Sequence, residues 1–139
     1  MTVLEWPASL PPLRRDGFGA RRQDNRRRLG SEGPPRYRRR YSLSAREVSL
    51  AIEGTRAQWA IFQDFHGQVT RDGTLPFYLP DPILDGQRIG TQDGAVLTDA
   101  SGAPLVLASR WLCLFGDAPP QDSIVSDAFR IEFSVWVMP

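Results

Sequence analysis

The sequence has no lysine, a single cysteine and a single histidine among its 139 residues. One cysteine excludes an internal disulfide, and its place in the apolar run "RWLCLFG" predicts that Cys113 is a small buried side chain. His66 lies about fifty residues from Cys113, so we expect neither a metal site nor a nucleophile–base pair from them. All 17 basic residues are arginine, whose guanidinium group pairs bidentately and stacks on aromatic rings, which suits fixed interfaces.

Long apolar runs are also absent. No stretch approaches the roughly 18 apolar residues that a membrane span needs. Arginine and proline interrupt every apolar stretch in the first 30 residues, so no signal peptide is predicted. The hydrophobic content (41%) and charged content (24%) are typical of a folded chain, and the length suits one domain. We therefore expect a soluble, non-secreted protein with no membrane contact.

Motifs of catalysis are missing as well. The chain has no GxxxxGK[ST] or GxGxxG phosphate loop, no HExxH, no CxxC and no GxSxG. Its aspartates stand mostly beside glycine or proline, as in "RDG", "PDP" and "LDG", where turns use them. Nothing in their spacing favours a catalytic carboxylate pair, so we expect neither an enzyme nor a cofactor.

Charge is divided unevenly along the chain. Residues 1–50 hold 12 arginines and 5 acidic residues, a balance of +7. Residues 51–139 hold 5 arginines and 11 acidic residues, a balance of −6, which leaves the net charge at +1. Two such halves attract each other, either within one chain or between neighbouring copies.

The first 35 residues do not resemble a core. "WPASLPPL" and "GSEGPP" are rich in proline, which removes backbone donors and favours an extended chain. Their few large apolar residues are Trp6, Leu10, Leu13, Phe18 and Leu29. We therefore predict an extended Pro/Arg-rich arm at residues 1–35, either docking on a partner or partly ordered, and a β domain at residues 36–139.

The rest of the chain alternates with the period of β-strands. "EVSLAIEG" and "FRIEFSVWV" place apolar side chains at every second position. "GTRAQWAIFQDFHG" predicts one short helix, capped by Thr55 with Gln58 and ended by Gly67. "LPFYLP", held between prolines, predicts an edge strand, and "LVLASRWLCLF" predicts a long strand. The expected fold is mainly β, a small antiparallel β-sandwich or half-barrel with one short helix.

The segment "RYRRRYS" alternates too, with a strand break expected near "SAR". Tyr37 and Tyr41 share one face of an extended chain, and Arg36, Arg38 and Arg40 share the other. Two interpretations are open. The segment is a strand or arm at a protein–protein interface, or it grips a nucleic-acid backbone.

The order of these elements resembles the lambda-type minor tail proteins of tailed bacteriophages. The resemblance covers most of residues 14–139 and rests on "REVSLAIEG", the helix "TRAQWAIFQDFHG", "GTLPFYLPDP" and the final "FRIEFSVWV". "RDGFG" stands where that family has a "GDGY"-like turn, "RIEFSV" where it has its last strand, and "WPASLP" is similar to the opening of short phage structural proteins. The arginine- and proline-rich arm and a longer insert at residues 83–104 depart from the family pattern.

This resemblance implies a distal-tail type β-sandwich that assembles into a ring, commonly six-fold, where the tail tube meets the baseplate or tip. The function would be assembly in the virion, with other tail proteins (tube, hub or tip) as neighbours. The basic arm of one subunit would then lie on the acidic body of the next. The expected interface residues are the anchors Trp6, Phe18 and Tyr37 and the charged rim of Arg26, Arg27, Arg28, Arg36, Arg38 and Arg40.

Two alternatives remain. A head–tail connector or tail-completion protein at the neck would bring the arginines close to packaged DNA. A free nucleic-acid-binding module is favoured by the 11 arginines between positions 14 and 40, interleaved with Phe18, Tyr37 and Tyr41. The near-neutral total charge and the acidic second half argue against that module, because acidic side chains repel phosphate.

Overall fold

The computed structural model describes residues 3–30, 32–40 and 42–139. Tyr41, which we placed beside Tyr37, lies outside the described residues. The elements in chain order are β1 (Leu4–Glu5), the 3-10 turn η1 (Arg15–Gly17), β2 (Gly19–Arg22), β3 (Arg26–Leu29), β4 (Arg36–Arg39), β5 (Arg46–Gly54), α1 (Arg56–Asp64), the π-helical turn η2 (Phe65–Val69), β6 (Phe77–Pro80), β7 (Arg110–Phe115), β8 (Gln121–Val125) and β9 (Ala128–Val137).

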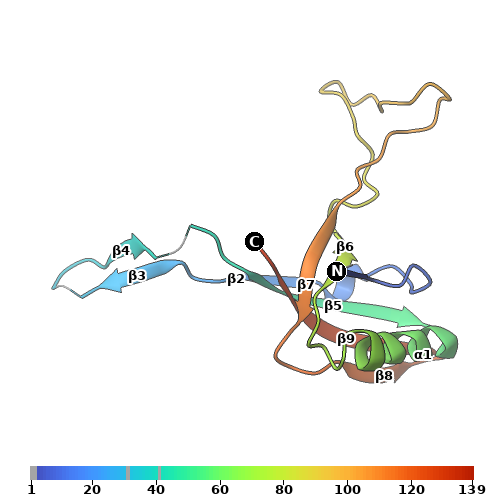
Figure 1. Cartoon of the computed structure of the whole chain (residues 1–139). Coiled ribbons are helices and arrows are strands. Elements are labelled where there is room, and N and C mark those ends of the chain that lie inside the picture. The colour runs from blue at the N-terminus through green and yellow to red at the C-terminus, as the bar shows by residue number, and fades with distance from the viewer. Residues whose placement is uncertain (1–2, 31, 41) are drawn as a thin grey trace.

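One mixed sheet forms the body, in the order β1-β6-β7-β9-β5-β2, with β8 also paired to β9 (Figure 1). The long strand β9 pairs with β5 along its length, from Gly54↔Phe129 to Arg46↔Val137. On its other edge β9 pairs first with β8 and then with β7. The mainly-β class with one short helix is confirmed. All pairs in this sheet are antiparallel except β1 with β6, which are parallel.

The helix begins as the sequence predicts. The Thr55 hydroxyl accepts a hydrogen bond from the Gln58 N–H, and the Gln58 side chain accepts one from the Thr55 N–H at 3.0 Å. Its end differs from the prediction, because the chain passes Gly67 and closes a π-helical turn at Val69. The buried Thr70 holds this turn, since its hydroxyl donates to the His66 carbonyl at 2.8 Å.

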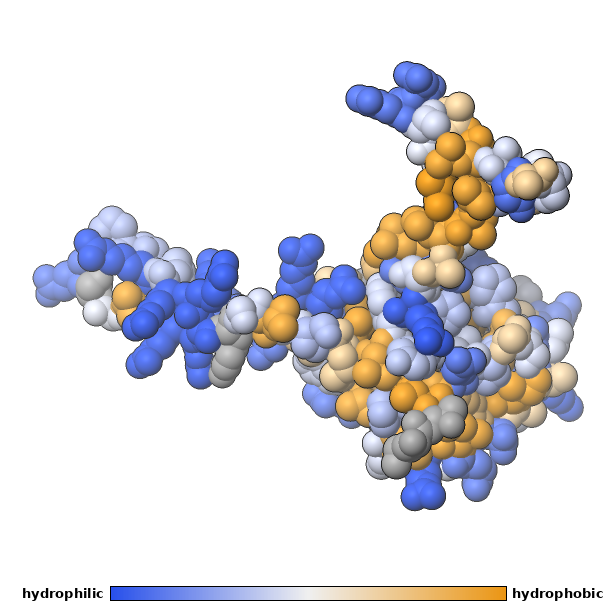
Figure 2. Space-filling model, turned by 45° about the horizontal axis from the view of Figure 1, so that its top comes forward, coloured by the Kyte–Doolittle hydropathy of each residue, from blue (hydrophilic) through white to orange (hydrophobic). Residues whose placement is uncertain are grey.

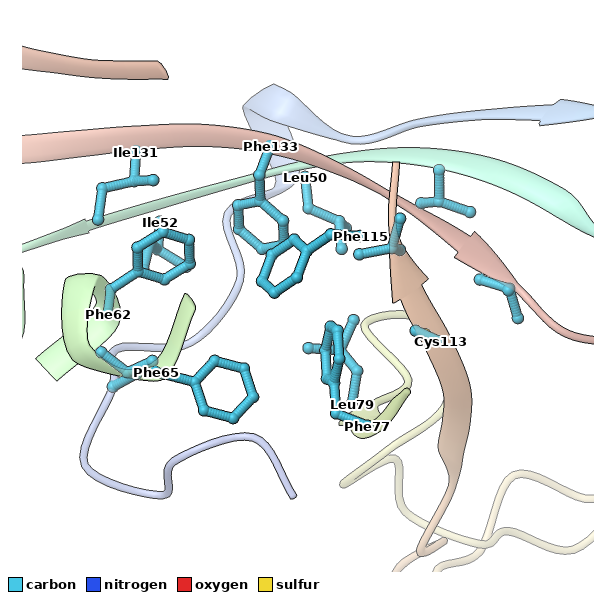
Figure 3. Packing of buried hydrophobic residues seen from close by; sticks show 14 residues of the cluster. Leu50, Ile52, Phe62, Phe65, Phe77, Leu79, Cys113, Phe115, Ile131 and Phe133 are labelled. Carbon is cyan, nitrogen blue, oxygen red and sulfur yellow. The ribbon is translucent and has the colours of Figure 1, made fainter. Parts of the chain in front are cut away.

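Aromatic rings fill the space between the helix and the sheet (Figure 3). Phe62 and Phe65, from α1 and η2, lie against Phe77, Phe115 and Phe133 of the strands, with ring centroids 5.3 to 6.3 Å apart in the contacting pairs. The predicted alternation is confirmed, because the inward side chains of β5 and β9 are buried: Val48, Leu50, Ile52, Ile131, Phe133, Val135 and Val137.

The N-terminal segment belongs to this body, contrary to our expectation of an arm at residues 1–35. The Trp6 ring stacks on Phe133 with centroids 5.5 Å apart, and Leu10 is 7% exposed. The Trp6 N–H donates to the Tyr78 carbonyl at 2.8 Å, which continues the pairing of β1 with β6. "LPFYLP" is therefore not left as an open edge. These contacts arise because large apolar side chains are buried wherever a core can receive them.

Two segments project from the body instead (Figure 1). The first is the hairpin of β3 and β4, a separate two-stranded sheet. It continues from β2 and β5, whose last register pair is Arg22↔Arg46, through residues 23–25 and 40–45. This interruption is the strand break expected near "SAR". The second projection is the insert of residues 83–107.

The insert contains an eight-residue repeat. A glycine in the left-handed region recurs at every eighth position, with φ of 78°, 85° and 85° at Gly86, Gly94 and Gly102. Between these turns, Ile89, Leu97 and Leu105 close a triangle of backbone hydrogen bonds, each N–H donating to the carbonyl of another member at 2.9 Å. The predicted strand "LVLASRWLCLF" is therefore divided, because its first residues complete the insert and only Arg110–Phe115 form β7.

Burial makes Cys113 unreactive. The residue is 0% exposed, and desolvation raises the pKa of its thiol to about 12. The thiolate is the reactive species, so a thiol reagent such as DTNB at pH 8 should label no cysteine in the native protein and one per chain in urea. Rapid labelling of the native protein, at the rate of the denatured protein, would mean that β7 does not lie inside the sheet.

Candidate functional site: an arginine hairpin and an acidic groove

The first projection is an arginine hairpin, defined here as residues 24–40. Its seven arginines are accompanied by only two acidic residues, Asp24 and Glu32. The strand register puts Arg26 opposite Arg39 and Arg27 opposite Arg38. Like charges directly opposite each other destabilise an antiparallel pair. Every residue of β3 and β4 is exposed, so no apolar face compensates for this repulsion.

Few contacts neutralise this charge. Arg26 pairs with Asp24 at 2.9 Å and lies over the Tyr37 ring at 4.4 Å. Within the described part of the chain, five arginines of the hairpin contact no carboxylate: Arg27, Arg28, Arg36, Arg38 and Arg39. An isolated two-stranded hairpin is marginally stable even without such repulsion. The hairpin therefore presents a surface that an anionic partner would stabilise.

The two faces of the hairpin differ. Residues opposite each other across a strand pair, and those two apart along a strand, lie on the same face. One face carries Arg26, Arg28, Tyr37 and Arg39, and it includes the contacts with Asp24 and Tyr37. The other face carries Arg27, Leu29, Arg36 and Arg38, and its three guanidinium groups have no carboxylate in the described chain.

A groove of about 590 Å³ lies on the body, over the outer side of β5 and β9. Its charged lining consists of Asp16, Glu47, Glu132 and Arg130, and its remaining wall includes Phe18, Ala118, Pro119 and Gln121. Glu47 forms no ion pair with any described residue. The three carboxylates outnumber the one guanidinium group, so we call this hollow the acidic groove.

Arg130 organises one side of the acidic groove. Its guanidinium group contacts Glu53 at 2.8 Å, Glu132 at 2.9 Å and Asp16 at 3.2 Å, and its side chain is 14% exposed. Hydrogen bonds to Glu132 and then Glu53 raise the pKa of Arg130. Arg14 joins the same network by pairing with Asp16 at 2.9 Å. These pairs fasten the turn η1 to the sheet.

The turn also explains an exception to the alternation in β5. Ala51 points to the outer side, where the sequence predicts exposure, yet it is 0% exposed. The Arg14 N–H donates to the Ala51 carbonyl at 2.8 Å, and Gly17 lies so close that an added Cβ would collide with the Ala51 methyl group. The N-terminal segment therefore covers both the core side and part of the outer side of β5.

The Asp16 pairs predict a dependence of stability on pH. The hydrogen bond from Arg14, and then the charge of Arg130, hold the pKa of Asp16 below its ordinary value. A lowered folded-state pKa stabilises the protein above the unfolded value of about 4, and this contribution is lost as the pH falls through the folded pKa. In thermal unfolding, Asp16→Asn should lower the Tm at pH 7 and flatten its decline below pH 4.

Asp93→Asn is a matched control for Asp16→Asn. Asp93 is exposed in the insert, and it forms no ion pair with a described residue, so Asp93→Asn should keep the wild-type decline of the Tm below pH 4. If Asp16→Asn keeps this decline too, the network around Arg130 does not stabilise the fold.

The insert exposes apolar side chains rather than charges. Figure 2 shows an apolar band on the projecting insert, above the body. The exposed residues of this band, with fractions from 39% to 55%, are Ile83, Leu84, Val96, Leu97, Leu105, Val106 and Leu107. Contiguous apolar surface of this kind is typical of interaction sites.

The structure separates the residues expected at an interface. Trp6 is partly buried and packs against the core of its own chain, which corrects its expected role as an anchor on a neighbour. Phe18 is 37% exposed and lines the acidic groove, while Tyr37 is 50% exposed beneath Arg26. The arginines expected at the rim lie together in the hairpin: Arg26, Arg27, Arg28, Arg36, Arg38 and Arg40. Sequence reasoning missed Glu47 and Glu132, although both are outward positions of the alternating strands.

Comparisons with known proteins add no assignment: no family model, no curated protein and no solved structure matches this chain. Among the described residues, no group of three or more histidine, cysteine, aspartate or glutamate side chains is placed to hold a metal ion. No helix in the described part of the chain is long and apolar enough to cross a membrane.

Proposed function

We propose that this protein is a structural virion protein of a tailed bacteriophage that forms part of a ring in the tail. The observation that carries the proposal is the pair of projections, because each exposes side chains that an isolated subunit cannot neutralise or bury. One exposes Arg27, Arg28, Arg36, Arg38 and Arg39, which contact no carboxylate among the described residues, and the other exposes an apolar band. The sequence resemblance to lambda-type minor tail proteins supports a location of the ring at the distal tail or at the junction of baseplate and tail tube.

A ring requires two different surfaces on each subunit. Head-to-tail contacts join one patch of a subunit to a different patch of the next, and they close into a ring when the rotation permits. The arginine hairpin and the acidic groove are two such patches of opposite charge on one chain. The partners in this proposal are further copies of the chain, six in the family it resembles, and the tail proteins of the tube, hub or tip.

A second candidate is favoured by the arginines on both faces of the hairpin. Guanidinium groups that face outward on two sides fit a phosphate backbone, and Tyr37 offers a ring for stacking. In a connector or tail-completion protein at the neck, this hairpin would contact DNA as it passes. The acidic groove argues for the tail ring, because carboxylates repel phosphate.

Cryo-electron microscopy of the particle that carries this protein tests the proposal. We expect a ring of density at the distal end of the tail, with the hairpin of each subunit lying across a neighbour. Density at the neck, with arginines facing the channel, would replace the proposal with head–tail joining. Absence of the protein from the particle would contradict a virion function and favour a free nucleic-acid-binding module.

A further inference from the structure

The geometry points to a specific subunit contact: we propose that the acidic groove of one copy receives the Arg27–Arg38 face of the hairpin of a second copy. This inference rests on the proposed ring and names the surfaces that form it. The occupant is a second copy of this chain, and the contact is an ionic one between the guanidinium groups of that face and the carboxylates of the groove.

The hairpin cannot fill the groove of its own chain. None of the described residues of the hairpin lines the groove. Figure 1 shows β3 and β4 leading away from the body along the direction set by β2 and β5. The pairing of β2 with β5 ends at Arg22↔Arg46, and the hairpin continues outward from that end of the two strands. A contact between hairpin and groove therefore joins two chains.

Charge complementarity identifies the two faces. Among the described residues, Arg27, Arg36 and Arg38 contact no carboxylate, and Glu47 forms no ion pair although Arg21 is its register partner on β2. Glu132 and Asp16 share Arg130 and keep side chains that are 57% and 53% exposed, so each can accept further hydrogen bonds. Arginine donates from a planar fork to two oxygens at once, which fits a groove lined by several carboxylates.

The composition of the chain supports a self-contact over an unrelated partner. The hairpin holds seven arginines and two acidic residues, and the rest of the chain holds ten arginines and fourteen acidic residues, so a hairpin on a neighbouring body nearly balances the charge. A nucleic acid would neutralise the hairpin and leave the groove unpaired. A second copy neutralises both surfaces with the same contact, and repeating it produces a head-to-tail series of subunits.

Charge-reversal variants of the full chain test the contact, with assembly measured by light scattering after size-exclusion chromatography. Glu47→Arg should weaken self-association on the order of ten-fold or more, because guanidinium groups then meet in the groove. The double variant Arg27→Glu/Arg38→Glu should do the same. A matched control, Arg28→Glu/Arg39→Glu, makes the same charge change on the other face and should keep most of the association.

Mixing the two defective variants provides the decisive measurement. Each Glu47→Arg copy retains a basic hairpin, which fits the wild-type groove of an Arg27→Glu/Arg38→Glu copy. The groove of the former no longer repels the altered hairpin face of the latter, because Glu47→Arg balances the four charged side chains of its lining. We expect the equimolar mixture to associate more strongly than either variant alone. Thermal unfolding of each variant separates this result from a failure to fold.

The outcomes distinguish this contact from the proposed function. If the wild type assembles and Glu47→Arg assembles equally well, the groove inference is wrong and the ring remains. If both hairpin variants weaken assembly equally, the assignment of one face is wrong. If the wild type stays monomeric and instead binds duplex DNA through the hairpin, both the contact and the ring are overturned in favour of nucleic-acid binding.

Discussion

Deletion of residues 1–13 is expected to unfold the protein. This segment supplies β1 and the side chains of Trp6 and Leu10, which lie against the core formed by α1 and the sheet. Removal of a partly buried tryptophan and a buried leucine costs up to about 5–10 kcal/mol together. That loss is comparable with the whole free energy of unfolding of a domain, about 5–15 kcal/mol. Circular dichroism and urea titration should show no cooperative transition.

The matched control for this deletion removes a longer segment, the arginine hairpin and the residues that connect it to the sheet. Arg22 and Arg46 are register partners in neighbouring strands, so an Asn-Gly turn can replace residues 23–45 and close β2 onto β5 directly. This shortened protein should unfold cooperatively at close to the wild-type urea midpoint and should no longer assemble. If the protein folds without residues 1–13, that segment is not part of the body. If it fails to fold after the hairpin replacement, the hairpin is not a separate projection.

Phe62→Ala is expected to lower the free energy of unfolding by about 3–5 kcal/mol. The Phe62 side chain is 1% exposed and points from α1 into the aromatic cluster (Figure 3). Its ring is 5.5 Å from that of Phe133, 5.9 Å from that of Trp6 and 6.2 Å from that of Phe115, measured between centroids. Alanine would leave a cavity that these rings, fixed on separate elements, cannot fill.

Phe18→Ala is the control for this substitution. Phe18 is 37% exposed, and its ring lines the acidic groove without a ring partner among the described residues, so the change should cost less than about 1 kcal/mol. Urea titration measures both changes in the free energy of unfolding, and the dependence on urea concentration (the m-value) should be unchanged. Equal effects of the two substitutions would show that Phe62 does not occupy the centre of the core.

The two projections are separate from the core of the body. Both leave the sheet from its ends, and the aromatic cluster contains no residue of the hairpin or of the insert. Substitutions in the hairpin or the insert should therefore alter assembly with little effect on the stability of the body. The half-exposed Leu97 and Leu105 of the eight-residue repeat, in contrast, need a partner to be buried.

The local structure of the body follows from short stretches of the sequence. β5 and β9 follow from alternation of apolar and polar residues, because a strand exposes successive side chains on opposite faces. The start of α1 follows from Thr55 and Gln58, because a capping box is satisfied within four residues. Cys113 was predicted to be buried from its apolar neighbours alone. Each of these features depends on residues that are close together in the sequence.

Which surfaces are inside depends on contacts between distant segments. Trp6 and Leu10 lie in a proline-rich stretch without periodicity. Leu10 is buried and Trp6 is partly buried because β6 and α1, far along the chain, pack against them. Ala51 is buried on the outer side because η1 covers it. The acidic groove combines Asp16, Glu47 and Glu132, which are far apart in sequence, so no local pattern could reveal it. Burial and charge clusters depend on contacts between distant segments, and those contacts exist only once the sheet has formed.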